Sequence, residues 1–358
     1  MPHKLLFVED NPSQVILFSD ALKDWNASNA MKQFELETAD TYQKGFSALN
    51  NSRFDGALLD LRLPDGSGRF AGQELAKVCV SQLGIPAAII SGEPADYDPA
   101  AGNGLLAVFN KGDSNSYDDA IGWFGGLWHM MSVLAGTRRQ IQKLGAQVFS
   151  RQVWPRWTAY EALAGISDEQ LVGIVARQYT SHIADILGID SPENVKWHPF
   201  ENYIQPALQL PRPHTGDIFK LDGNLWIVLT PQCDMATQKA PTVLLAACDS
   251  KPDIQEWKNR LSDLKQGSNS KQQQAEKFFR NLINQAEPAV HFLPPLVDGQ
   301  PLLVDFKNLR TLPWADLQAR LADRFASVAS PFLANLTQRF GAYVSRVGQP
   351  NIDTSHLT

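Results

Sequence analysis

Acidic, hydroxyl and amine side chains stand directly after short apolar segments in the first third of the chain. Glu9 and Asp10 follow KLLFV, Asp60 ends GALLD, Ser91 follows PAAII, and Lys111 follows LLAVFN. Carboxylates that crowd together raise one another's pKa unless a cation neutralises them, and hard oxygen ligands of this kind suit Mg²⁺. A neighbouring lysine and hydroxyl can hold phosphoryl oxygens. This set of side chains is therefore equipped to form an acyl phosphate on a carboxylate.

The apolar segments alternate with stretches of helical period, a rhythm that predicts a parallel β-sheet with helices on both faces. The predicted strands are Lys4–Val8, Gln33–Thr38, Gly56–Asp60, Pro86–Ile90 and Leu105–Asn110, and helices are expected near residues 12–25, 41–50, 69–82 and 114–135. Prolines and glycines between Ser91 and Lys111 leave room for only a short helix. Because the carboxyl ends of parallel strands converge on one crevice, the five side chains are expected to meet there.

The motifs FVEDN, ALLDLRLPDGSG, IISG and FNKGD follow one another at intervals that resemble the receiver domain of bacterial two-component response regulators, over about residues 3–135. The resemblance implies a flavodoxin-like fold, Mg²⁺ as cofactor, and a histidine kinase or phosphotransfer protein as partner. The site residues it implies are Asp60 as phospho-acceptor, Ser91 and Lys111 as phosphoryl contacts, and Glu9, Asp10, Asp60 and the backbone carbonyl of Arg62 as metal ligands.

The sequence departs from the family pattern at two places. Gly112 follows Lys111 where the family has a proline, and Val108 stands where the family has a switch aromatic, with Phe109 one place later. The usual coupling of Ser91 to a rotating aromatic side chain is therefore not implied. All the charged site residues are present, which favours a working acceptor over a degenerate receiver.

The chain of 358 residues is long enough for two or three domains. We expect a receiver domain over 1–136, a helical connector over 137–210 and a small α+β output domain over 211–358. The fold class is thus a doubly wound, five-stranded parallel α/β sheet, then a helical segment, then an α+β part. The stretch from Ser167 to Gln170 predicts a helix N-terminus, and Asp222-Gly223 predicts a β-hairpin that begins a small barrel.

A second group of reactive residue types lies in the C-terminal part. Its members are His214, Asp217, Cys233, Asp234, Cys248 and Asp249. Cysteine and histidine could contribute to a zinc site, but no Cys-x-x-Cys pair is present. Cys233 could instead act as a nucleophile with His214 as base and Asp234 beside it. The interpretation we favour is that Cys233 and Cys248 are small buried residues of the barrel.

Three functions remain open. The first is a response regulator that controls its C-terminal output by protein interaction, the second a receiver-controlled hydrolase or nuclease that uses the Cys233 region, and the third an unusual DNA-binding transcription factor. The net charge is −8 over residues 1–136 and +2 over the rest, and the best recognition-helix candidate has only Arg177, so nucleic-acid binding is not favoured.

Composition and the remaining patterns set the expected location and assembly. A hydrophobic fraction of 44% with 20% charged residues is that of a folded globular chain. The start, MPHKLLFVED, does not read as a secretory signal, and no apolar run is long enough for a membrane span. We therefore expect a cytoplasmic bacterial protein, with a possible homodimer through the helix at 118–135, whose apolar residues surround its whole circumference.

Overall fold

The computed structural model describes residues 2–64, 71–92, 104–163, 165–188, 197–207, 211–249, 254–296 and 300–347. The chain divides into two compact units, Met1–Ile186 and Leu187–Thr358. The boundaries of the three-part division expected from the sequence stay a prediction. Gly68 of the ALLDLRLPDGSG motif, the short helix expected between Ser91 and Lys111, and the last residues of the chain lie outside the described residues.

The first unit is built on a five-stranded parallel sheet with the order β2-β1-β3-β4-β5. Its strands are β1 (His3–Val8), β2 (Phe34–Ala39), β3 (Gly56–Asp60), β4 (Ala87–Ser91) and β5 (Leu106–Asn110). β3 and β4 are buried at every position, as strands covered on both faces must be. The doubly wound, flavodoxin-like sheet predicted from the sequence is confirmed, with strand ends within one residue of those expected.

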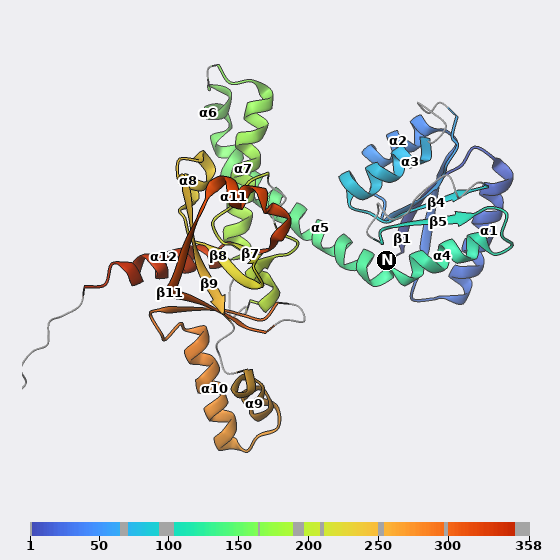
Figure 1. Cartoon of the computed structure of the whole chain (residues 1–358). Coiled ribbons are helices and arrows are strands. Elements are labelled where there is room, and N and C mark those ends of the chain that lie inside the picture. The colour runs from blue at the N-terminus through green and yellow to red at the C-terminus, as the bar shows by residue number, and fades with distance from the viewer. Residues whose placement is uncertain are drawn as a thin grey trace, which may run out of the picture. The chain divides into compact units, whose positions relative to one another are not determined.

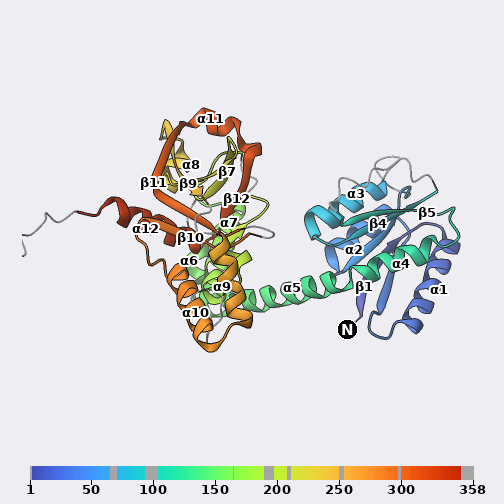
Figure 2. The ribbon, with the colours of Figure 1, turned by 60° about the horizontal axis from the view of Figure 1, so that its bottom comes forward.

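Helices cover both faces of this sheet (Figures 1 and 2). α1 (Pro12–Ser28) and α4 (Ser116–Gly126) pack on one face, and α2 (Tyr42–Asn51) and α3 (Ala71–Lys77) pack on the other. A π-helical turn, Val78–Leu83, continues α3. The Asn11 side chain accepts a hydrogen bond from the backbone of Ser13 at the start of α1, and Thr41 caps α2 in the same way.

The helix expected over 114–135 is two helices in the structure. α4 ends at Gly126, and α5 (Trp128–Val148) begins after a break at Leu127. Two consecutive glycines weaken the helix just before the break. Gly125 is required by packing, because a Cβ there would lie 2.5 Å from the Trp25 ring of α1.

The first unit continues as a group of helices. α5 is followed by a π-helical turn (Phe149–Val153), a 3₁₀ turn (Trp154–Arg156), α6 (Trp157–Glu161) and α7 (Asp168–Leu187). The predicted helix start at Ser167 is confirmed, since the Ser167 hydroxyl accepts from the Gln170 backbone at 3.2 Å and the Gln170 side chain accepts from the Ser167 backbone at 3.0 Å. A small apolar cluster around Val148, Val153 and Tyr160 holds these helices together.

The second unit contains a seven-stranded antiparallel sheet with the order β10-β11-β9-β8-β7-β12-β6. The strands are β6 (Tyr203–Ile204), β7 (Asp217–Leu221), β8 (Asn224–Val228), β9 (Thr242–Asp249), β10 (Val290–Leu293), β11 (Leu302–Pro313) and β12 (Arg324–Val328). The hairpin predicted at Asp222-Gly223 joins β7 to β8, and both turn residues have positive φ, 55° and 85°, as a type I′ turn requires.

Helices and short turns fill the connections of the second unit. They are 3₁₀ turns at Pro199–Asn202 and Leu321–Asp323 and the helices α8 (Gln232–Thr237), α9 (Ile254–Gln266), α10 (Asn269–Ile283), α11 (Trp314–Ala319) and α12 (Phe332–Val344). α9 and α10 lie side by side (Figure 1) and pack against each other through Trp257 and Phe279, whose ring centres are 5.0 Å apart. Searched over the described residues, no helix combines the length and apolar character that crossing a membrane needs.

Candidate functional site

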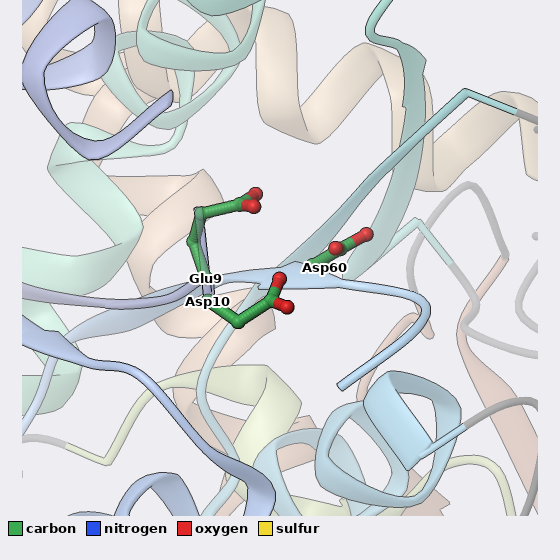
Figure 3. A group of neighbouring side chains, drawn as sticks. All are labelled: Glu9, Asp10 and Asp60. Atoms are coloured by element: carbon green, nitrogen blue, oxygen red, sulfur yellow. The ribbon is translucent and has the colours of Figure 1, made fainter. Parts of the chain in front are cut away.

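Three carboxylates gather at the carboxyl ends of β1 and β3. Glu9 and Asp60 are buried and Asp10 is exposed. One oxygen from each side chain lies within 4.8 Å of the other two (Figure 3), and no other group of three His, Cys, Asp or Glu in the described ranges is spaced to hold a metal ion. The convergence predicted for Glu9, Asp10 and Asp60 is what the structure shows.

Lys111 joins this group through two ion pairs. Its Nζ lies 2.6 Å from Oε2 of Glu9 and 3.1 Å from Oδ2 of Asp60. The backbone N–H of Lys111 donates to the carbonyl of Ser91 at 2.9 Å, so the pairing of β5 with β4 positions the lysine and places Ser91 at the same edge. The Ser91 side chain is buried.

Burial dominates the electrostatics of the two inner carboxyls. Desolvation raises the pKa of Glu9, the hydrogen bond from Lys111 opposes this, and the charge of Asp60 adds to the rise. Desolvation likewise raises the pKa of Asp60, while the charge and hydrogen bond of Lys111 and the backbone N–H of Arg62 lower it. The pKa of both groups stays above its ordinary value. One lysine therefore compensates the two buried carboxylates only in part, and a further cation would stabilise them.

The donor set fits Mg²⁺. Three carboxylates supply hard oxygen ligands, and the exposed Asp10 leaves the site open to the water molecules that Mg²⁺ usually keeps. Glu9, Asp10 and Asp60 are the side chains that would hold the ion. Arg62, whose carbonyl was expected to complete the site, lies two residues beyond the end of β3, and its backbone N–H donates to the Asp60 carboxylate.

Gly72 lets α3 approach the backbone of the acceptor residue. A Cβ at this position would lie 1.9 Å from the carbonyl oxygen of Asp60, and the Gly72 N–H donates to the carbonyl of Leu61 at 3.1 Å. A side chain at Gly72 would push α3 away from β3. This role was not predicted from the sequence, although a glycine in the first turn of a helix is a signal for it.

Tyr117, at the start of α4, is a second residue that the sequence analysis missed. Its hydroxyl donates to Gln14 of α1 at 2.6 Å, and its ring contacts Phe7 and Phe18. Desolvation and the nearby charges of Glu9 and Asp60 raise the pKa of the phenol, so the hydroxyl stays protonated and donating.

Two other positions near Lys111 point to opposite faces of the sheet. Val108 packs with the core cluster under α2 and α3, whereas Phe109 packs with the cluster under α1 and α4. Successive residues of a strand alternate in this way. The Phe109 ring therefore does not occupy the position that the family's switch aromatic would have at residue 108.

Among the described side chains of the second unit, His214, Asp217, Cys233, Asp234 and Cys248 form no group spaced to hold a metal ion. Asp217 is fully buried and accepts from the Ser327 hydroxyl at 2.5 Å, from Arg324 at 3.2 Å and from the His214 backbone at 2.8 Å. It thus ties β7 to β12.

The two cysteines of this unit differ in their surroundings. The expectation that both are buried is right for Cys248 and wrong for Cys233, which lies in the first turn of the short helix α8 and is exposed. Its Sγ is 3.8 Å from the Asp234 carboxylate. Desolvation and the charge of Arg212 lower the pKa of His214.

No family model matches the chain, and no curated protein matches it. Among solved structures, it is similar to a receiver domain of Methanospirillum hungatei, at 19% identity over 37% of this chain and 98% of that one, with a TM-score of 0.29. A chemotaxis response regulator of Vibrio cholerae is 20% identical over 34% of this chain and 98% of its own, with a TM-score of 0.28. The receiver domain of a Pseudomonas aeruginosa sensor histidine kinase, solved with magnesium in its active-site cleft, is 18% identical over 35% and 99%, with a TM-score of 0.28.

Proposed function

We propose that the first unit is a phosphoryl acceptor of a phosphorelay, with Asp60 as the residue that is phosphorylated. The observation that carries the proposal is the position of the Asp60 carboxylate between Lys111 and two further carboxylates, at the open end of a parallel sheet. Bound Mg²⁺ would neutralise the acidic group and the oxygens of the incoming phosphoryl group. Glu9 and Asp10 are the residues that hold it beside Asp60.

The proposed reaction is a displacement at phosphorus. A carboxylate oxygen of Asp60 attacks the phosphorus of a phosphohistidine on a kinase or phosphotransfer protein, and the new O–P bond forms as the P–N bond breaks. The bond's electron pair returns to the ring nitrogen, and the histidine, which carries a proton on its other ring nitrogen, leaves as neutral imidazole. The ion pair between Lys111 and Asp60 is then replaced by one between Lys111 and a phosphoryl oxygen, and the Ser91 hydroxyl donates to another. The phosphorylated state so stabilised alters the protein interactions of residues 137–358.

The test is the intact mass of the purified chain after incubation with Mg²⁺ and acetyl phosphate. We expect one phosphoryl group on the wild type and on Asp113→Asn, which removes a nearby exposed carboxylate, and none on Asp60→Asn. Lys111→Ala should still be modified, because the nucleophile remains. Addition of a phosphoryl group to Asp60→Asn at the wild-type level, or its absence from the wild type with both acetyl phosphate and phosphoramidate, would refute the assignment.

A further inference from the structure

A second pocket lies at the opposite end of the same sheet. It has a volume of about 660 Å³ and is lined by residues at the starts of β1, β3 and β4 together with one side of α5. Volumes of this size are typical of sites for small organic ligands. Since the acidic site lies at the carboxyl ends of these strands and this pocket at their amino ends, the two are separate.

The wall formed by α5 is fixed to the sheet by polar contacts. Nδ1 of the buried His3 lies 2.8 Å from the Asp55 carboxylate, and its Nε2 lies 2.9 Å from the Ser132 hydroxyl of α5. The ring of His3 also meets Trp128 edge-on, with ring centres 4.3 Å apart. These contacts connect β1, the start of β3 and α5, so the pocket is bounded by connected elements.

Three arginines line the pocket against a single carboxylate. Arg53 precedes β3, and Arg138 and Arg139 are consecutive on α5. The carboxylate of Asp55 is already engaged by His3 and by the backbone N–H of Lys4 at 3.1 Å. The formal charge of these four groups is therefore +2, whereas residues 1–136, which contribute Arg53 and Asp55, carry a net charge of −8.

Arg138 is held in place by the protein. Its Nη2 donates to the carbonyls of Leu83 and Gly84, at 2.7 and 2.8 Å, at the end of the π-helical turn. Arg53 and Arg139 are exposed. One guanidinium is thus positioned in advance, and two are available to close on an anion.

Apolar side chains form the rest of the lining. They are Leu49, Phe54, Leu83 and Ile85, of which Leu49, Phe54 and Ile85 are buried in the core behind the pocket. A fully hydrated ion gains nothing from such a surface, whereas a flat apolar ring does. The combination of apolar lining and guanidinium groups matches a molecule that has a ring at one end and a phosphate at the other.

We propose that this pocket binds a small organic phosphate, with the phosphate held by Arg53, Arg138 and Arg139 and the organic part against the apolar lining. Such a ligand contacts the sheet and α5 at once and strengthens the attachment of α5 to the sheet. The pocket would then be a second input to the first unit, independent of Asp60.

The test is calorimetric titration of the full chain with AMP and phenyl phosphate, beside adenosine, phenol and inorganic phosphate as partial ligands. EDTA and the Asp60→Asn background keep the probes out of the acidic site. We expect AMP or phenyl phosphate to bind at least ten-fold more tightly than its partial ligands, and hydrogen exchange in residues 128–148 to slow on binding. In Arg53→Ala/Arg139→Ala this affinity should fall at least ten-fold.

The matched control is Lys143→Ala/Arg151→Ala, which removes two exposed positive charges of the same helical segment outside the pocket and should bind as the parent does. Three results would overturn the proposal. The first is that neither organic phosphate shows saturable binding at millimolar concentration. The second is that the organic phosphates bind no more tightly than their dephosphorylated counterparts or than inorganic phosphate. The third is that the control and the test variant lose affinity equally.

Discussion

Replacing Lys111 with methionine tests the electrostatics of the acidic site. The lysine side chain is 18% exposed, and its partners Glu9 and Asp60 are 1% and 12% exposed. Lys111→Met keeps most of the apolar stem and removes the charge. Two carboxylates then remain buried beside the exposed Asp10 without the lysine that pairs with both.

The size of the effect follows from this burial. Removing one partner of a buried ion pair costs about 3–5 kcal/mol. Because Lys111 is reached by water and Asp10 is exposed, we expect a loss near the lower end, about 3 kcal/mol of unfolding free energy for the first unit at pH 7. In a unit of this size such a loss lowers the melting temperature by about 6–12 °C.

The loss should depend on pH with a definite sign. The pKa values of Glu9 and Asp60 are raised above the ordinary 4.5 and 3.8, mainly by desolvation. A carboxyl whose folded pKa lies above its unfolded pKa destabilises the fold once it is ionised, and the fold recovers stability as the pH falls from the folded toward the unfolded pKa. Without Lys111 both pKa values rise further, so the variant should regain stability on acidification from pH 7 and approach the wild type.

Hydrogen exchange of peptides from β1 and β3 measures the stability of this unit alone, which whole-chain melting of a two-unit protein does not. Lys44→Met is the matched control, because Lys44 pairs with Asp40 at 2.7 Å but both side chains are at least 60% exposed. We expect no measurable change there. Equal effects of the two substitutions, or a loss in Lys111→Met that is the same at pH 7 and pH 5, would refute the reasoning.

Two further substitutions test packing in the two units. Gly72→Ala should destabilise the first unit by about 1–3 kcal/mol, measured by hydrogen exchange of peptides from β1 and β3, because the new Cβ meets the Asp60 carbonyl. Gly122→Ala, whose new Cβ meets nothing within 4 Å, should leave stability unchanged or slightly raised, and the reverse order would contradict the close approach of α3. Asp217→Ala should cost the second unit about 3–5 kcal/mol by removing the buried partner of Arg324, seen as faster hydrogen exchange in β7 and β12, whereas unchanged exchange would show that the carboxylate is dispensable.

The sequence was sufficient for the sheet of the first unit because its strands, apart from β2, are short apolar runs followed by polar residues. The run GALLD, for example, is buried at all five positions, and its short length and the polar residues that flank it identify it as a buried strand. The convergence of Glu9, Asp60 and Lys111 then follows from one rule about the carboxyl ends of parallel strands.

Side-chain partners were beyond the reach of that reasoning. Nothing in the spacing of the sequence says that Lys111 pairs with Glu9 more closely than with Asp60, or that Tyr117 reaches Gln14. Such contacts depend on the depth of each side chain and on the angle at which α4 packs. The break at Leu127 was likewise hidden, because the apolar pattern runs through it into α5.

In the second unit, turn residues were enough to predict a local hairpin, whereas the pairing of strands that are distant in the sequence could not be predicted. Asp222-Gly223 predicted its hairpin, but no strand was predicted at the segment that forms β12. RFASV is five residues long and buried only at its last three positions, so its period is too brief to recognise. It becomes a strand through its pairing with β7 and β6, which lie far away in the sequence.

That pairing sets an order of events for a chain emerging from the ribosome. All five strands of the parallel sheet have been synthesised by Asn110, so the first unit can collapse while the rest is still being made. The antiparallel sheet has to wait, because β6 near the start of its unit has β12 as its sheet neighbour, through Tyr203 and Val328. Until then β7 has an open edge, and such edges recruit other chains. The C-terminal unit is thus the part of this protein most exposed to misassembly during synthesis, and a chain that stops before residue 324 would keep that edge permanently.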